Sequence, residues 1–406
     1  MRALFAISFV LGCAAACVSR PAPPDAAATP PDASRPAGPQ AAPTVDPQLE
    51  MATALHEPCP AAEQGARAAD DALDADPGSA AKLYRLGQWL QLRDAHCFSE
   101  PAPARHAASA AAAFAAALEL DPTRAEYVIA LAQARPDDPR ASTALDALLL
   151  RDPLNGAARL LKARRSGTKP EEAIALLSEK AVRCVAGMFL ELGDLQRGLQ
   201  HFEAARDAYQ SELTRTCEPL GVTWHGEELS RRGAARLGLV TASLKLGDPE
   251  TARRQLAWLH WDAVDAALPL VDPEVEDELW GTVEKAKLPA LPKGPAPTAK
   301  DAILRLEPAA TRGDWARFKA LLVDENDLDR AFPACAQYGD DTGPRGTYAL
   351  CIFRELLPED SRVEGCEEQG KASAICTVVG SDASAKWKVF ATRSGPGWRV
   401  ASSKKP

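Results

Sequence analysis

The chain has 406 residues, of which 46% are hydrophobic and 25% are charged, a composition typical of globular rather than disordered proteins. Its formal net charge of −9 argues against nucleic-acid binding and against electrostatic adhesion to anionic lipid, because nucleic acids and anionic lipids are themselves negative and would repel it. The length allows two or three domains.

The chain opens with the apolar run MRALFAISFVLG, which is too short to span a bilayer and predicts a secretory signal peptide over residues 1–16. The small residues of AAAC, directly before Cys17, resemble the lipobox of bacterial lipoproteins, in which a cysteine is acylated after cleavage. The resemblance implies lipidation of Cys17 and an outer-membrane-anchored lipoprotein that faces the periplasm or the cell surface. Cys13 is the weaker candidate, and an ordinary secretory signal is the alternative.

Residues 17–48 are rich in Pro and Ala and almost free of large apolar side chains. Such a segment buries too little surface to offset its ordering entropy, and its prolines favour an extended polyproline conformation. Behind a lipidated cysteine we expect a tether that holds a folded body away from a membrane. A disordered terminus without a role is the alternative.

Residues 49–288 carry Ala and Leu at three- and four-residue spacing, with short breaks that contain Pro, Gly and Asp. This pattern predicts a mainly α-helical array. Three segments end alike, in ALDADP, ALELDP and LLLRDP. In each, the proline cannot continue the first helix but fits the opening turn of the next.

These segments resemble the tetratricopeptide repeat, a family of 34-residue helical pairs that commonly end in Asp-Pro. The first helix of one pair begins near Ala80 and carries Leu86 and Gly87, and the second carries Phe114 between small residues. The spacing between the Asp-Pro pairs departs from the family's repeat length. A generic helical array without repeat ancestry is therefore the alternative.

The first helices of such pairs line a concave face that binds extended peptides or partner proteins. The resemblance implies a protein or peptide partner on this face, in contact with Tyr84, Gln88, Gln91, Glu126 and Gln133. Near the end of the array, Trp258 and Trp261 are either an exposed anchor for a partner or the cap of the helical core.

The Pro-rich segment 289–299 predicts a linker to a small α+β domain over residues 300–406. Runs of alternating polarity at ASAICTVVG, AKWKVFATR and GWRVAS predict strands, and SGPG between the last two predicts a hairpin turn. A helix with GDWARFKAL followed by antiparallel strands resembles the NTF2-like family, whose cone can hold a ligand. A generic α+β domain is the alternative.

The ten cysteines bear on the compartment. Removing Cys13 with the signal and assigning Cys17 to lipid leaves eight, an even number that suits full pairing in an oxidising environment. Successive helices joined by a short turn run antiparallel, so the start of one lies beside the end of the next. This geometry predicts two disulfides, Cys59–Cys97 and Cys184–Cys217.

The four C-terminal cysteines allow three connectivities. Cys366 and Cys376 flank a turn-like sequence, which leaves Cys335 with Cys351. These cysteines do not suggest a zinc site, because even Cys366 and Cys376 are ten residues apart.

The chain shows no nucleophile elbow, phosphate-binding glycine loop or His-Glu helix motif. All six histidines precede the C-terminal domain, so the Asp/His pair of some NTF2-like relatives is absent from it. The sequence therefore predicts no enzymatic activity, no cofactor and no metal. The expected function is a non-enzymatic protein–protein interaction scaffold. The alternative is a small-molecule or peptide ligand-binding protein whose C-terminal α+β domain provides the pocket.

Overall fold

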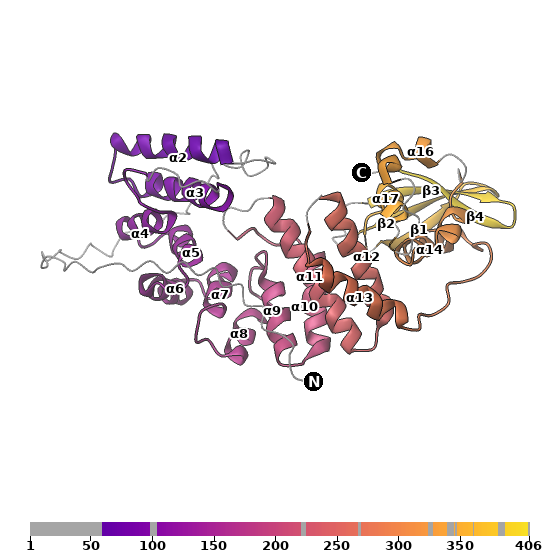
Figure 1. Ribbon diagram of the computed structural model, residues 1–406, viewed down its shortest axis with the longest axis horizontal. Coiled ribbons are helices and arrows are strands. Elements are labelled where there is room, and N and C mark those ends of the chain that lie inside the picture. Colours follow the sequence, from indigo (N-terminus) through magenta and orange to yellow (C-terminus); the bar gives the residue numbers. More distant parts are fainter. Residues whose placement is uncertain are drawn as a thin grey trace, which may run out of the picture. The chain divides into compact units, whose positions relative to one another are not determined.

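The computed structural model describes residues 59–97, 104–220, 225–266, 269–323, 328–338, 345, 347–359, 361–380 and 386–404. The expected signal peptide, Cys17 and the expected tether lie outside these residues. In the described ranges the chain is mainly helical and ends in a small antiparallel sheet (Figure 1). None of the helices in these ranges is long and apolar enough to cross a membrane.

The helices before the Pro-rich segment follow one another along the chain. They are α2 (Cys59–Asp74), α3 (Ala80–His96), α4 (Ala110–Leu120), α5 (Ala125–Ala134), α6 (Pro139–Arg151), α7 (Gly156–Ala163), α8 (Pro170–Leu177), α9 (Met188–Gly198), α10 (Phe202–Thr214), α11 (His225–Lys245), α12 (Pro249–Asp265) and α13 (Pro273–Lys285). The helix predicted to begin near Ala80 is thus confirmed as α3.

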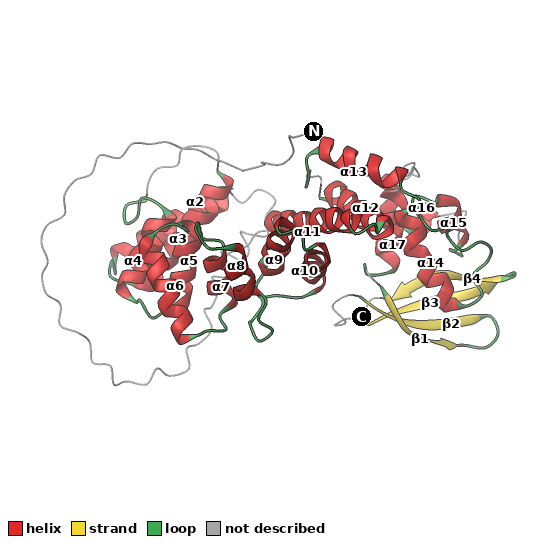
Figure 2. Cartoon of the chain, turned by 90° about the horizontal axis from the view of Figure 1, so that it is seen from below, coloured by secondary structure: helices red, strands yellow, loops and turns green. Residues whose placement is uncertain are grey.

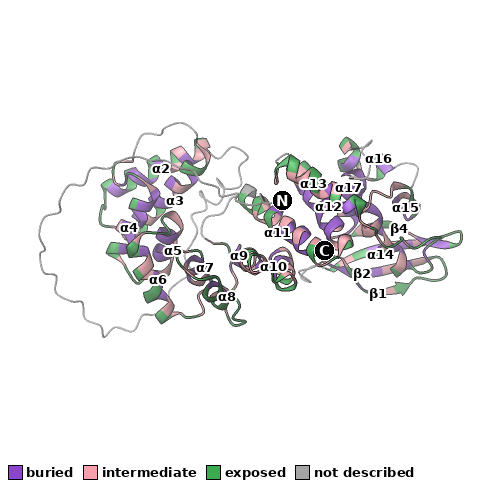
Figure 3. Ribbon diagram, turned by 60° about the horizontal axis from the view of Figure 1, so that its bottom comes forward, coloured by how far each residue is buried: buried purple, intermediate pink, exposed green. Residues whose placement is uncertain are grey.

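Each helix from α2 to α12 packs against the next one. Alternate helices also touch: α5 contacts α7, α7 contacts α9, and α9 contacts α11. Tyr84 of α3 reaches Tyr127 of α5, with ring centroids 5.0 Å apart. We call α3, α5, α7, α9 and α11 the odd layer and their even-numbered neighbours the even layer. Figure 3 shows buried residues along one side of these helices and exposed residues along the other.

Glycines set how closely the two layers approach. A Cβ added at Gly87 of α3 would lie 2.4 Å from the ring of Phe114 on α4, and one at Gly193 of α9 would lie 2.5 Å from the ring of Tyr209 on α10. Both rings are fully buried. The aromatic side chains therefore pack directly on the backbone of the neighbouring helix, which requires a residue without a side chain at that point.

The C-terminal part begins with helices and ends with strands. It contains α14 (Ala299–Thr311), α15 (Trp315–Ala320), α16 (Leu328–Ala331), a 3-10 helix η1 (Pro333–Tyr338), α17 (Thr347–Leu356), β1 (Arg362–Glu368), β2 (Ser373–Val379), β3 (Lys386–Ser394) and β4 (Gly397–Lys404). The strands form an antiparallel sheet in the order β1-β2-β3-β4, and α14 contacts all of them (Figure 2).

The three predicted strands are confirmed as β2, β3 and β4, and the predicted hairpin pairs Ser394 with Gly397 across the turn. β1, with the charged sequence RVEGCEE, was not among the strands predicted from the sequence. The residues of β1 other than Val363 and Cys366 are exposed, so it is an edge strand without the alternation that marks a half-buried strand. Its backbone pairing with β2 holds it in the sheet.

Trp258 and Trp261 are not an exposed anchor for a partner. Their exposed fractions are 0% and 5%, and Trp258 of α12 packs on Phe353 of α17 with ring centroids 5.7 Å apart. One hydrophobic cluster contains Trp258 together with strand residues such as Val389. The two tryptophans therefore belong to the core that joins the last array helices to the C-terminal part.

The Pro-rich residues 289–296, which we call the strap, are hydrogen-bonded to the C-terminal part. The amide of Trp398 donates to the carbonyl of Ala296 over 2.9 Å, so the strap pairs with β4. The carbonyls of Pro289 and Leu291 accept hydrogen bonds from Arg312 and Arg317. Because proline has no amide proton, such a segment cannot complete a strand ladder, and arginine side chains take the place of strand partners.

A buried ion pair joins α11 to the segment between α17 and β1. The guanidinium of Arg236, which is fully buried, donates to both carboxylate oxygens of Glu359 over 2.5 and 2.6 Å. It also donates to Asp262 and Gln255 of α12. Burial alone would raise the pKa of Glu359, but the Arg236 charge outweighs burial and holds this pKa at about 2.

The glycine packing predicts opposite effects for two alanine substitutions. Gly87→Ala should destabilise the protein by about 1–2 kcal/mol, because the clash with Phe114 exceeds the gain in helix propensity. Gly281→Ala on α13, where nothing lies within 4 Å of the added Cβ, should stabilise it by about 0.5–1 kcal/mol. Urea unfolding of both variants measures the difference. Equal stabilisation by both would contradict the close approach of α3 and α4.

The buried pair predicts a pH-dependent stability. Glu359→Gln should cost about 3 kcal/mol at pH 7, because it leaves the Arg236 charge incompletely compensated. Since the pKa of Glu359 is lower in the folded state than the usual value of about 4.3, its contribution is present above pH 5 and is lost as the pH falls toward 2.

Urea unfolding at pH 7 and pH 3 measures both effects. Glu367→Gln, on the exposed side of β1, is the matched control and should change the free energy of unfolding by less than about 0.5 kcal/mol. If Glu359→Gln loses as much stability between pH 7 and pH 3 as the unmodified chain does, then Glu359 is not the titrating group.

Candidate functional site

Tyr84 and Tyr127 form the centre of the expected partner-binding face. Tyr84 on α3 packs against Tyr127 on α5 and against Phe114, with ring centroids 5.0 and 5.7 Å away. Tyr127 is buried, whereas Tyr84 is half-buried. Gln88 lies one helical turn after Tyr84, and its side chain acts to lower the pKa of the Tyr84 hydroxyl. The ring contacts thus fix the position of a phenol beside a side-chain amide.

An ion pair borders this aromatic pair. The guanidinium of Arg124 donates to Glu126 over 2.6 Å and lies 5.9 Å from the Tyr127 ring centroid. Burial raises the pKa of Tyr84 to about 12, with a further contribution from the Glu126 charge. The Tyr84 hydroxyl therefore stays protonated at physiological pH. The site offers a hydroxyl, a side-chain amide and a carboxylate, all suited to hydrogen bonding.

The remaining two expected residues are Gln91, which lies seven residues after Tyr84 on the same face of α3, and Gln133. Gln91 is half-buried on α3. Gln133, at the end of α5, donates from Nε2 to the main-chain carbonyl of Leu220 over 2.9 Å, although 87 residues separate them. The structure thus brings Tyr84, Gln88 and Glu126 together and gives Gln133 a partner within the chain.

The segment that Gln133 holds runs beside the start of α9. Val185 and Glu218 form a parallel bridge, in which the amide of Ala186 donates to Glu218 and the amide of Glu218 donates to Cys184. A short stretch of the chain itself therefore lies against the array through main-chain hydrogen bonds and one side-chain amide.

The cysteines of the described ranges form four pairs that match those expected. Cys59–Cys97 and Cys184–Cys217 have Cα atoms 5.2 and 5.1 Å apart, and the C-terminal pairs are Cys335–Cys351 and Cys366–Cys376. Cys366 and Cys376 face each other across β1 and β2. Disulfides at these positions fit a protein exported to an oxidising compartment.

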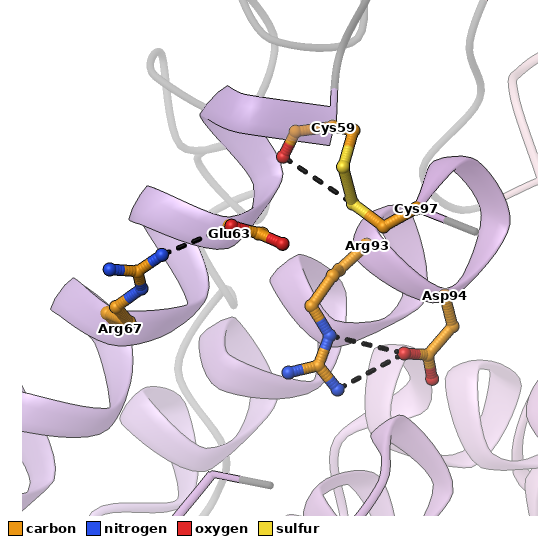
Figure 4. The surroundings of a disulfide bond; sticks show 6 residues. All are labelled: Cys59, Glu63, Arg67, Arg93, Asp94 and Cys97. Carbon is orange, nitrogen blue, oxygen red and sulfur yellow. Dashed lines mark hydrogen bonds and ion pairs between the residues drawn. A yellow bond between two sulfur atoms is a disulfide. The ribbon is translucent and has the colours of Figure 1, made fainter. Parts of the chain in front are cut away.

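One group of possible metal donors lies in the described part of the chain, namely Cys59, Glu63 and Cys97 (Figure 4). The two sulfur atoms are bonded to each other, so neither is a thiolate that can bind a metal. Glu63 accepts a hydrogen bond from Arg67 over 3.1 Å. These residues clamp α2 to the end of α3 and do not form a metal site while the disulfide is intact.

Two buried carboxylates elsewhere have structural partners. Glu212 of α10 accepts hydrogen bonds from the amides of Gly187, Phe189 and Leu190 at the start of α9, and from Arg231 of α11. This carboxylate satisfies amides that have no partner within the helix.

Asp70 of α2 accepts hydrogen bonds from the amides of Arg105 and His106, which lie before α4. Burial acts to raise the pKa of Asp70, but these hydrogen bonds outweigh it and lower the pKa. The carboxylates of Glu212 and Asp70 thus hold loops and helix ends in place.

A cavity of about 590 Å³ lies between the strap and the C-terminal part. Its walls come from the strap, α14, α15 and the turn between β3 and β4, with Glu250 of α12 at one side. Arg305, Arg312 and Arg317 line it. The sequence alternative placed a pocket in the C-terminal domain, whereas this cavity lies between that domain and the segment expected to be a linker.

Tyr127 and the cavity arginines were not identified from the sequence. Tyr127 directly follows Glu126, and its position in the helical pattern could have placed it beside Tyr84. The arginines carry no motif, because they come from separate helices and meet only when the strap packs on them.

Comparison with protein-family models, curated proteins and solved structures finds no significant match for this chain.

Proposed function

We propose that the chain is a non-enzymatic scaffold of the bacterial envelope, whose odd layer binds an extended segment of a partner protein. The observation that supports this most directly is the hydrogen bond from Gln133 to the main-chain carbonyl of Leu220. It is a local example of the odd layer holding a segment of chain through a main-chain carbonyl, and helical repeats use extended concave surfaces for binding.

The arrangement of the layers supports a tetratricopeptide-like origin for this face. Helix pairs pack through a glycine against an aromatic ring at Gly87 and Phe114, and again at Gly193 and Tyr209. The family places small and aromatic residues at such positions. We infer from these contacts a repeat-like array in which the residues around Tyr84 face the partner.

The chemistry around Tyr84 fits a main-chain ligand. Gln88 can both donate to a carbonyl and accept from an amide, and Glu126 can accept from an amide. The rigid ring pair of Tyr84 and Tyr127 provides an apolar surface between these polar groups. We propose that the partner segment lies along α3 and α5, with its side chains on the rings.

We propose a second function, ligand binding, for the cavity beside the strap. The observation that favours it is the combination of a volume of about 590 Å³ with mostly apolar walls and a few arginines. Ligand sites in proteins commonly have this size and this composition. The C-terminal part would then contribute to a working pocket as well as to the stability of the last array helices.

We also propose an acyl anchor at Cys17, followed by a Pro-rich tether, in the outer membrane. The four disulfides support export, and none of the described helices is long and apolar enough to cross a membrane. Attachment through lipid therefore fits the described ranges.

The anchor predicts that Cys17→Ala releases the protein from the membrane fraction. The acyl chains supply the membrane affinity, so their loss should move nearly all of the protein to the soluble fraction after cell breakage. Mass spectrometry of the N-terminus of the unsubstituted protein should show an acylated Cys17. An unmodified N-terminus downstream of Cys17 would contradict the proposal, and Cys13→Ala is the control that should leave anchoring unchanged.

The partner-binding face predicts site-specific cross-linking in cells. A photoreactive phenylalanine at Gln91 should give discrete adducts with a partner protein. The same residue at Glu172, which is exposed on α8 of the even layer, should give none. Replacing Gln88 and Glu126 by alanine should reduce the Gln91 adducts about tenfold or more, because two hydrogen-bonding groups are removed.

Two results would argue against the odd layer as the binding face. One is equal adduct yield at Gln91 and Glu172. The other is adduct yield at Gln91 that does not change when Gln88 and Glu126 are replaced. Mass spectrometry of the adducts identifies the partner, and circular dichroism of each variant checks that the helices are intact.

A further inference from the structure

Three arginines cross from the C-terminal helices to the strap and form one side of the cavity. Arg305 donates from Nη1 to the carbonyls of Gly294 and Pro295 over 3.2 and 3.5 Å. Arg312 donates to Pro289, and Arg317 donates to Leu291 over 3.3 Å. These hydrogen bonds explain why the strap stays in place, but they use only part of the donor capacity of each guanidinium.

The charges of the three arginines are balanced differently. Arg312 pairs with Glu250, and Arg317 pairs with Asp314. Arg305 makes no ion pair with a carboxylate in the described part of the chain, and its printed contacts are the two strap carbonyls. Its Nε and Nη2 groups, which together can hold a carboxylate in a bidentate pair, donate to no acceptor in that part.

The lining as a whole is positive. It contains Arg305, Arg312, Arg317 and Arg399 against two acids, Glu250 and Asp301. Glu250 is occupied by Arg312, and Asp301 accepts a hydrogen bond from the Thr298 hydroxyl over 2.7 Å. An anion entering the cavity therefore faces four guanidinium groups and two carboxylates in the lining, with Asp314 behind Arg317 outside it.

The wall next to Arg305 is apolar. Leu304, its neighbour on α14, is 45% exposed and lines the cavity. Pro308 of α14 and Pro396 of the β3–β4 turn also line the cavity. A ligand with an apolar body would cover Leu304 and remove this surface from water.

We propose that this cavity binds an apolar molecule that ends in a single carboxylate, with the carboxylate on Arg305 and the apolar body against Leu304 and the proline side chains. This inference rests on the second proposed function and names its ligand class. The ligand chemistry has two sources, a free fatty acid and the C-terminal end of an apolar peptide.

Calorimetric titration of the oxidised full chain with two matched pairs of probes tests the inference. The first pair is octanoate and 1-octanol. The second is acetyl-Ala-Ala-Leu-Val with a free or an amidated C-terminus. In at least one pair the acid should bind about tenfold or more tightly than its neutral partner, because only the acid can pair with Arg305. Which pair binds identifies the source.

Variants then locate the bound molecule. Arg305→Gln should weaken binding of the preferred acid about tenfold or more, whereas Arg393→Gln, an exposed arginine of β3 outside the cavity, should leave it unchanged. Leu304→Ala leaves every arginine contact with the strap in place and should weaken binding roughly three- to tenfold through lost apolar contact.

The outcomes separate the inference from the function on which it rests. If neither pair binds, the proposed ligand class is overturned. If acid and neutral forms bind equally, ligand binding stands but the carboxylate inference is overturned. Unchanged affinity in both Arg305→Gln and Leu304→Ala would show that the bound molecule lies elsewhere.

Discussion

The fully buried guanidinium of Arg236 is the constraint on which the C-terminal half depends. A buried charge must be compensated, and here the compensation comes from two directions, Asp262 and Gln255 on α12 and Glu359 before β1. Because Glu359 is distant in sequence, the ion pair joins the last array helices to the α+β part. Trp258 and Phe353 extend the same junction with apolar contact. The pair specifies which surfaces meet, and the apolar cluster around it supplies most of the burial.

In the N-terminal half the corresponding constraint is the close approach of neighbouring helices. Phe114 and Tyr209 each lie on the backbone of a helix in the other layer, at Gly87 and Gly193. This packing orients α3 and α5 so that Tyr84 meets Tyr127. The polar groups proposed to bind a partner are thus placed by contacts in the core beneath them. Disulfides at the ends of two helix pairs hold the same arrangement covalently.

The strap runs between α13 and α14 and forms one wall of the cavity. A Pro-rich segment has carbonyl acceptors but few amide donors, so it can be held only by donors from elsewhere. Arginines of α14 and α15 supply them. The same side chains then form one side of a cavity, and their charge sets which ligands suit it. A segment that could have been a passive connection is therefore part of a proposed binding site, and it is separate from the proposed partner face of the odd layer.

The sequence by itself determined the features that depend on local pattern. Helical periodicity and Asp-Pro breaks predicted the first helices, alternation predicted β2, β3 and β4, and antiparallel helix geometry predicted the disulfides Cys59–Cys97 and Cys184–Cys217. Features that depend on distant residues were decided only by the tertiary structure. The charged edge strand β1 forms because β2 pairs with it. Trp258 is buried because α14 and α17 cover it. Gln133 hydrogen-bonds the carbonyl of Leu220 because the folded array brings these distant residues together. Arg305, Arg312 and Arg317 have no shared motif, because it is the path of the strap across α14 and α15 that brings them into one cavity.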